Sequence, residues 1–228
     1  SRHTMPALIC GSLAFDTIMV FGDQFKNHIL PDQIHILNVA FLGVHGEALQ
    51  AGLVEVQVSG GAACNSTSGE PSYVLRALGL DRQAAESSLR FSLGHGTTEA
   101  DIDLAIAAVQ REWRRLRELS DGPVGACSAT GEAGARQQGT WVRFMLNAAG
   151  GRIAGAEFRA YADPDTLAAC QALCRDLAGK PLPEPGLGAA AGWCEALGFP
   201  ESRLASLLVV EDALRNALAA AAASAVPR

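Results

Sequence analysis

The sequence predicts a mixed α/β protein of the α+β type. Strand-like and helical segments alternate between residues 43 and 120. Residues 140–147 and 152–161 then show the apolar–polar alternation of strands and are joined by Ala-Ala-Gly-Gly, which is typical of a β-hairpin. The last third of the chain has a helical pattern. Because residues 121–138 are rich in Gly, Ala and Ser, we expect a linker there between two α+β units.

Composition argues against several classes of protein. The chain has 228 residues, enough for one or two domains, and 49% of them are hydrophobic, which is ample for a packed core. A net charge of −6 argues against nucleic acid as the main partner. Six cysteines at irregular spacing do not form a disulfide framework. There is no signal-peptide pattern and no apolar run of the ~20 residues that span a bilayer, so we expect no membrane partner and a cytoplasmic location.

The first half of the chain is expected to alternate strands with short helices. Residues 7–20 predict a buried strand interrupted by Gly-Ser. A short helix over residues 47–53 and a strand over residues 54–58 are expected next. A helix over residues 73–78, ended by a glycine, and a strand over residues 89–93 complete this part.

A long helix is predicted to begin after Thr98. Thr98 and Asp101 have the spacing of a capping box, in which each side chain satisfies a backbone N–H of the other residue. Apolar residues then recur at steps of four and three, so one face of the helix is expected to be buried. The other face is expected to be solvated rather than a binding patch. It carries Arg111, Arg114, Arg115 and Arg117.

The second half contains further helix signals. Asp163 and Pro164 are expected to open a helix, with the aspartate as N-cap and the proline in the first turn. Cys170 and Cys174 lie four residues apart on that helix and share one face, where core packing is favoured over a metal half-site. Cys194, beside a tryptophan, is expected in the core as well.

Cys64 is the candidate nucleophile. It lies in a run of Gly, Ala, Ser, Asn and Thr, which would leave its thiol in an accessible loop. A reactive cysteine needs such access because its thiolate has to reach a target. The alternative is a buried free cysteine that acts as a small hydrophobic residue. The local composition leaves both interpretations open.

The order of residues around Cys64 is more specific. The blocks GVHGEAL, SGGAACNSTSGEPSYVLRALG and SSLRFSLGHGTTEADID resemble the C-terminal part of the cysteine desulfurases, over residues 36–120. These enzymes use pyridoxal phosphate to take sulfur from L-cysteine, and the resemblance implies the small domain of a fold-type I pyridoxal-phosphate enzyme. It implies that Cys64 carries the sulfur as a persulfide. It also implies that Arg90 binds the substrate carboxylate, a task that suits a planar bidentate donor.

The cofactor of that family depends on a lysine, because pyridoxal phosphate is held as a Schiff base. The lysines of the chain are Lys26 and Lys180, and neither lies in residues 36–120. The resemblance therefore implies a sulfurtransferase of the desulfurase family. We nevertheless expect the isolated chain not to bind pyridoxal phosphate and to be inactive as a desulfurase.

Residues 1–42 resemble a different family. The strings ALICGSLAFDTIMV and ILPDQIHILNVAFL are similar to the N-terminus of the ribokinase family, nearest the adenosine kinases. The resemblance implies that Asp16 binds sugar hydroxyls, although this aspartate could equally end a strand. No later GxGD segment supplies a catalytic base, so we do not expect kinase activity. The two resemblances meet at HILNVAF, residues 35–41, as in a fusion or a chimera.

Residues 139–222 resemble the U-type iron–sulfur cluster scaffolds. The motifs that carry this resemblance are GRIAGAEFRAYA, TLAACQAL, AGKPL and LLVVEDALRNAL. Scaffolds of this type hold a cluster with three cysteines, and those positions fall on Gln138, Asp163 and Ser206. Since iron–sulfur clusters require thiolates, we do not expect this chain to hold one in the usual manner.

The resemblances together imply sulfur transfer for iron–sulfur cluster assembly. L-Cysteine would be the family substrate, scaffold or sulfur-acceptor proteins the partners, and a homodimer a possible assembly. Two alternatives stay open: a non-catalytic interaction or scaffold module, including a chimeric fragment, and a fragment of an adenosine or sugar kinase. The expected domains are a kinase-like strand segment (1–42), a desulfurase C-terminal domain (36–120), a linker (121–138) and a scaffold-like domain (139–228).

Overall fold

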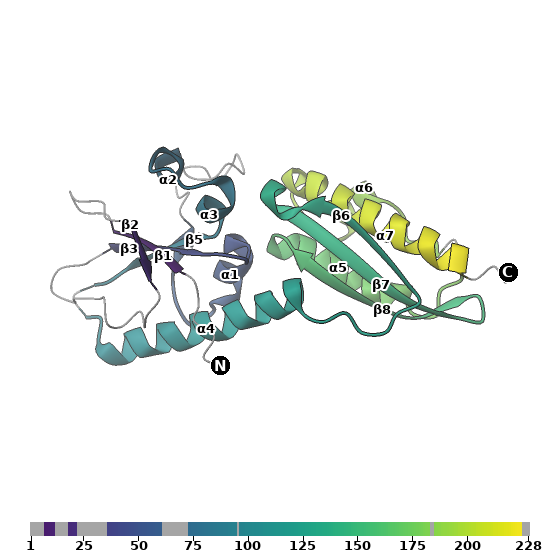
Figure 1. The fold of residues 1–228 in the computed structure, drawn as a ribbon, viewed down its shortest axis with the longest axis horizontal. Coiled ribbons are helices and arrows are strands. Elements are labelled where there is room, and N and C mark those ends of the chain that lie inside the picture. Colours follow the sequence, from purple (N-terminus) through teal and green to yellow (C-terminus); the bar gives the residue numbers. More distant parts are fainter. Residues whose placement is uncertain are drawn as a thin grey trace. The chain divides into compact units, whose positions relative to one another are not determined.

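The computed structural model describes residues 7–11, 18–21, 36–60, 73–94, 96–182 and 185–224. These residues form helices and two small antiparallel sheets, so the predicted α+β fold class is confirmed. The chain divides into two compact units, Ser1–Arg117 (unit 1) and Glu118–Arg228 (unit 2). Figure 1 shows unit 1 in purple to teal and unit 2 in teal to yellow.

Among its described residues, unit 1 forms a five-stranded antiparallel sheet with the order β2-β1-β3-β5-β4. The strands are β1 (Ala7–Gly11), β2 (Ile18–Phe21), β3 (Ile36–Phe41), β4 (Ser59–Gly60) and β5 (Ser88–Ser92). The single strand expected over residues 7–20 is wrong, because β2 pairs antiparallel with β1. The first of these strands ends at Gly11.

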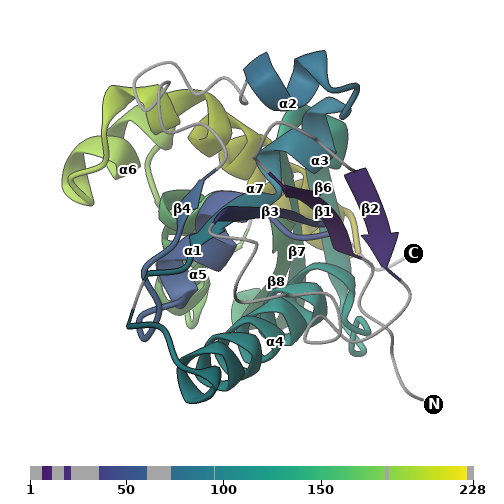
Figure 2. The ribbon, with the colours of Figure 1, turned by 90° about the vertical axis from the view of Figure 1, so that its left-hand side faces the viewer.

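Helices lie on both sides of this sheet. In Figures 1 and 2, α2 (Tyr73–Ala77) and α3 (Arg82–Glu86) lie on one side and α4 (Glu99–Asp121) lies on the other. Ala40 of β3 forms an apolar cluster with buried side chains of α2, α3 and the turn between them. These are Leu75, Leu80, Ala84 and Ala85. The remaining helix of this region, α1 (Gly46–Gly52), follows β3 closely, as expected.

The predicted start of α4 is confirmed. The Thr98 N–H donates to Asp101 Oδ2 at 2.8 Å, and the Asp101 N–H donates to Thr98 Oγ1 at 3.3 Å, as in a capping box. Val109 and Leu116, on the expected apolar face, are both 5% exposed. On the polar face, Arg111 is exposed and pairs with Glu55 at 2.8 Å. Such exposed pairs add little stability.

Residues 54–58 do not form the expected strand. Val54 is 79% exposed, and the Val56 N–H donates to the carbonyl oxygen of Leu53 in a turn. The ladder to β5 begins only at Ser59. The segment therefore has the apolar–polar alternation of a strand but no buried face. Alternation alone does not show whether another part of the protein covers the apolar side chains.

Unit 2 contains, among its described residues, a three-stranded antiparallel sheet with the order β6-β7-β8. The strands are β6 (Ala129–Ala135), β7 (Thr140–Ala149) and β8 (Arg152–Tyr161). The predicted hairpin between β7 and β8 is confirmed. Its turn uses Gly150 and Gly151 at φ of 58° and 72°, which glycine adopts without strain.

The helices of unit 2 are α5 (Pro164–Leu177), α6 (Ala190–Ala196) and α7 (Leu204–Ser224), the last preceded by a 3₁₀ turn at Glu201–Arg203. Their apolar side chains form one core with those of β7 and β8. Cys170, fully buried, and Cys194, 8% exposed, belong to this core, as predicted. None of the helices among the described residues is long and apolar enough to cross a membrane.

The segment expected as a linker contains β6 and a 3₁₀ turn at Arg136–Gln138. Its small residues allow α7 to approach the sheet closely. A Cβ atom added to Gly131 would lie 2.0 Å from the backbone nitrogen of Ala217. The Gly- and Ala-rich composition from which a linker is expected therefore reflects, in β6, tight packing between a strand and a helix.

Candidate functional site

Two groups of side chains are candidates for function. The first, the Arg90 site, consists of Arg90, Ser59 and Asn38 in unit 1. Arg90 lies in β5, directly opposite Ser59 of β4 and Asn38 of β3. Since directly paired residues of an antiparallel ladder point to the same face, the three side chains share one face of the sheet.

The strand pairing orients the Arg90 guanidinium. Its Nε donates to Ser59 Oγ at 3.1 Å, and the arginine is exposed. Within the described parts of the chain, its two terminal nitrogens form no hydrogen bond. A guanidinium held in this way can present its terminal N–H groups to a carboxylate. Asn38 Oδ1 beside it is buried and has no hydrogen-bond partner among the described residues.

The predicted nucleophile, Cys64, lies outside the described residues, as do Asp16, Lys26 and His95. Cys64 is close in sequence to a described strand, because β4 ends at Gly60, four residues earlier. Ser59, the partner of Arg90, therefore belongs to the strand that leads into the Cys64 segment. The role of Cys64 stays a prediction.

The residues of the chain do not fit pyridoxal phosphate. Lys180 is the one lysine in the described residues, and it is exposed in the turn after α5, in unit 2. No lysine lies between Gly43 and Gly179. Because the cofactor needs a lysine for its Schiff base, no chemical step through it is derived for this chain.

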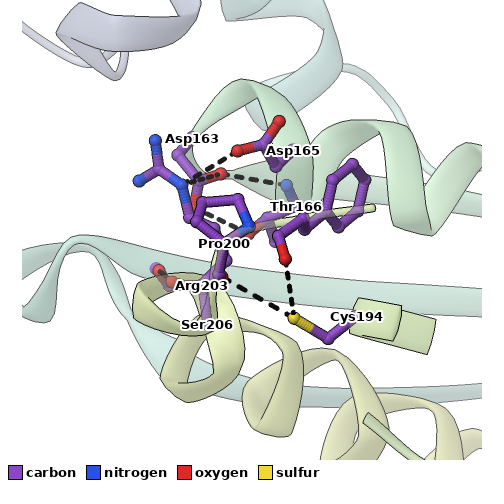
Figure 3. A network of polar contacts seen from close by, with 9 residues as sticks. Asp163, Asp165, Thr166, Cys194, Pro200, Arg203 and Ser206 are labelled. Carbon is purple, nitrogen blue, oxygen red and sulfur yellow. Dashed lines mark hydrogen bonds and ion pairs between the residues drawn. The ribbon is translucent and has the colours of Figure 1, made fainter. Parts of the chain in front are cut away.

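The second candidate, the Arg203 network, lies in unit 2 where β7, α5 and α7 begin. It comprises Thr140, Asp163, Asp165, Thr166, Arg203 and Ser206, most of which are shown in Figure 3. Asp163 is the N-cap of α5, as predicted: its Oδ1 accepts from the Thr166 N–H at 3.0 Å and its Oδ2 from Thr166 Oγ1 at 2.6 Å. Its side chain is only 3% exposed.

Arg203 contacts both carboxylates at the start of α5. Its Nε lies 3.0 Å from Asp165 Oδ2 and 3.6 Å from Asp163 Oδ1. Figure 3 shows Nε of Arg203 facing the two aspartates. The turn that carries Arg203 is itself fixed, because the thiol of Cys194 donates to the carbonyl oxygens of Phe199 and Pro200 at 3.4 and 3.6 Å.

A hydroxyl pair joins β7 to α7. Thr140, the first residue of β7, donates from Oγ1 to Ser206 Oγ at 3.2 Å. Asp163 and Ser206, two of the three positions at which the resemblance in the sequence implied cluster ligands, therefore lie in one network, whereas Gln138 is exposed in the turn before β7. The side chains of Thr140 and Arg203 were not singled out from the sequence, because neither stands in a motif.

These donors do not fit an iron–sulfur cluster. The network offers carboxylate and hydroxyl oxygens where a cluster requires thiolates. Among the described residues, no group of three or more His, Cys, Asp or Glu side chains could hold a metal ion. Burial raises the pKa of Cys170 well above its ordinary value and that of Cys174 to about 12, so both thiols are neutral at pH 7.

Comparison with known proteins relates part of the chain to cysteine desulfurases. No family model matches the sequence. The chain is similar to the cysteine desulfurase IscS of Photorhabdus laumondii, with 57% identity over 86 residues, which cover 38% of this chain and 21% of that protein. It is similar to the cysteine desulfurase IscS of Ruthia magnifica, with 43% identity over 119 residues, 52% of this chain and 28% of that protein.

A third relative, the cysteine desulfurase IscS of Escherichia coli O139:H28, is 56% identical over 86 residues, 38% of this chain and 21% of that protein. The chain thus spans only 21–28% of the length of these curated relatives. A region of the chain is related to cysteine desulfurases.

Proposed function

We propose that the desulfurase-like region, residues 36–120, carries sulfur for iron–sulfur cluster assembly. Cys64 accepts and holds the sulfur as a persulfide, and Arg90 binds the carboxylate of a cysteine-derived donor. The similarity to cysteine desulfurases carries this proposal. The scaffold-like region, residues 139–228, is the second domain of the proposed fusion and forms the acceptor side.

The Arg90 site supports the proposed carboxylate clamp. Ser59 occupies Nε of Arg90, and within the part of the chain that the structure describes no group bonds to the terminal nitrogens, which can therefore take a ligand. Ser59, whose Oγ accepts a hydrogen bond from Arg90 Nε, stands five residues before Cys64 in the sequence. The proposed clamp and the proposed sulfur carrier are therefore joined by a short stretch of chain.

The transfer step is a thiol–disulfide type of exchange. The Cys64 thiolate attacks the outer, sulfane sulfur of a donor persulfide, a new S–S bond forms, and the S–S bond of the donor breaks. The donor thiolate leaves with the electron pair of the broken bond and takes up a proton. No oxidant or reductant is consumed, and no pyridoxal phosphate is needed for this step.

The donor is expected to be a small persulfide with a free carboxylate, such as cysteine persulfide, because the chain lacks the lysine that would generate sulfur from cysteine. A covalent link between the carrier region and the scaffold-like region raises the effective concentration of one for the other. A second function, a non-catalytic interaction module, is favoured by the same missing lysine. The experiment below distinguishes the two.

Sulfur loading of the purified chain tests the proposal. The full chain is incubated with cysteine persulfide, and the mass increase of one sulfur is mapped to individual cysteines. We expect the persulfide on Cys64 and its loss in Cys64→Ser, with Cys127→Ser as the matched control because Cys127 is a free, half-buried cysteine outside the desulfurase-like region. Loading of Cys127 in preference to Cys64 would contradict the carrier role and favour the interaction module.

Substitution of Arg90 tests the clamp separately. Arg90→Gln removes a charge-assisted contact worth about 1.5–3 kcal/mol, so loading from cysteine persulfide should slow about 10- to 100-fold. Loading from inorganic polysulfide, which has no carboxylate, should not change. An equal effect on both donors would show that Arg90 does not bind the carboxylate.

A further inference from the structure

We infer that the positively charged side chain of Arg203 links the start of α5 to the start of α7, at the place where the scaffold resemblance implies a metal centre. The inference comes from the disagreement between that resemblance and the side chains present. It concerns unit 2 and does not depend on the sulfur-carrier role of Cys64. Unit 2 is accordingly a metal-independent domain.

Charge balance gives Arg203 this role. Asp163 is almost fully buried, and an ionised carboxylate in such a place needs compensation. The two hydrogen bonds from Thr166 come from neutral groups on its own helix. Arg203 is the positive charge that the described structure places against Asp163 and Asp165, and it comes from a different part of the chain.

The network also explains how three separate segments meet. Arg203 joins the turn before α7 to the start of α5, and the Thr140–Ser206 hydrogen bond joins α7 to β7. In a metal-stabilised domain, ligands from such segments converge on the ion, and binding contributes to folding. Here the guanidinium and the hydroxyl pair supply that connection, as Figure 3 illustrates for Arg203.

The oxygen atoms of Asp163 and Ser206 are already hydrogen-bonded. Both oxygens of Asp163 accept hydrogen bonds from Thr166, and Ser206 is bonded to Thr140. An added cation would have to displace the guanidinium and would find hard oxygen ligands rather than thiolates. Wild-type unit 2 should therefore neither contain a transition metal nor gain stability from one.

The chain offers a matched control on the same helix. Arg215 of α7 also pairs with two carboxylates, Glu211 at 2.5 Å and Asp212 at 2.9 Å, but its side chain is 65% exposed, against 26% for Arg203. In the full chain, Arg203→Met should lower the unit 2 Tm by roughly 10 °C, since it leaves a buried carboxylate without its cation. Arg215→Met should lower it by less than about 2 °C.

Hydrogen exchange localises the effect. In Arg203→Met, amides of residues 163–167 and 204–208 should exchange faster, while those of the β7–β8 hairpin should change less. Equal Tm values for the Arg203 and Arg215 variants would overturn the inference. Should Arg203→Met fail to fold, Arg203→Lys, which keeps the charge but loses the planar fork, is expected to give an intermediate Tm, and a wild-type Tm would overturn the inference.

Metal analysis of the wild-type chain is an independent test. Elemental analysis after aerobic and anaerobic purification should find well under one zinc or iron per chain. Addition of EDTA, Zn²⁺ or Fe²⁺ should shift the unit 2 Tm by no more than about 1 °C, because stabilisation by a ligand requires that it binds the folded state. One tightly bound metal per chain whose removal lowers the Tm would overturn the inference.

Discussion

Replacement of Gly131 by alanine is expected to destabilise unit 2 strongly, although it adds a single methyl group. Gly131 lies in β6 beneath α7. The added Cβ would lie 2.0 Å from the Ala217 nitrogen and 2.5 Å from the Asn216 carbonyl carbon, both backbone atoms. Ordinary contacts begin near 3.4 Å, so the helix and strand would have to separate by more than 1 Å, judged from these distances.

The expected size follows from the cost of overpacking a close-packed core, about 1–3 kcal/mol and occasionally more. The upper end applies here, because the obstructing atoms belong to a helix backbone, which cannot turn aside as a side chain can. Ala217 and Val210 of α7 are fully buried, so a displaced α7 would also lose apolar contacts. We expect a loss of about 3 kcal/mol in the free energy of unfolding.

Urea unfolding of the full chain, followed by tryptophan fluorescence, measures this loss. With a slope of about 1–3 kcal/mol per molar urea, the midpoint of the unit 2 transition should fall by about 1 M or more. Gly155→Ala is the control: Gly155 lies in β8 of the same sheet, and no atom lies within 4 Å of its added Cβ. Similar midpoints for the two variants would refute the packing argument.

Two further predictions concern titration and helix capping. Burial raises the pKa of Cys174 to about 12, so between about pH 9 and pH 12 this thiol is deprotonated in the unfolded chain but still protonated in the folded one. The free energy of unfolding therefore falls as the pH rises, by about 1.4 kcal/mol per pH unit for this group. Cys174→Ala should reduce the slope of the free energy of unfolding against pH, whereas parallel curves for the variant and the wild type would contradict the burial argument. Thr98→Ala removes one half of the capping box of α4. Backbone amides in the first turn of α4 should then exchange hydrogen roughly five-fold faster. An unchanged exchange rate there would show that Asp101 alone is enough to cap the helix.

Local features of the fold could be predicted from the sequence. The capping box at Thr98 and Asp101, the N-cap at Asp163 and the glycine turn between β7 and β8 all depend on residues within a few positions of one another. Their side chains satisfy neighbouring backbone groups or permit a positive φ wherever the rest of the chain lies. For such features, all the interacting groups lie within one short stretch of sequence.

The errors share a different cause. The Gly- and Ala-rich segment before β7 predicts a linker but contains β6, and residues 54–58 predict a strand but are exposed at Val54. In each case the structure depends on what lies opposite: α7 covers Gly131, whereas nothing in the described residues covers Val54. Amino-acid composition and apolar–polar alternation do not show which element, if any, packs against a segment.

Residue identity and order alone establish the fold class and the desulfurase-related region. They also establish that residues 36–120 contain no lysine and that positions 138, 163 and 206 are not cysteines. Which distant residues meet depends on the folded structure. It paired Arg90 with Ser59 and brought Arg203 to Asp163 and Asp165 across 40 and 38 positions of the chain. Long-range contacts of this kind depend on strand register and helix packing, which are properties of the folded chain as a whole.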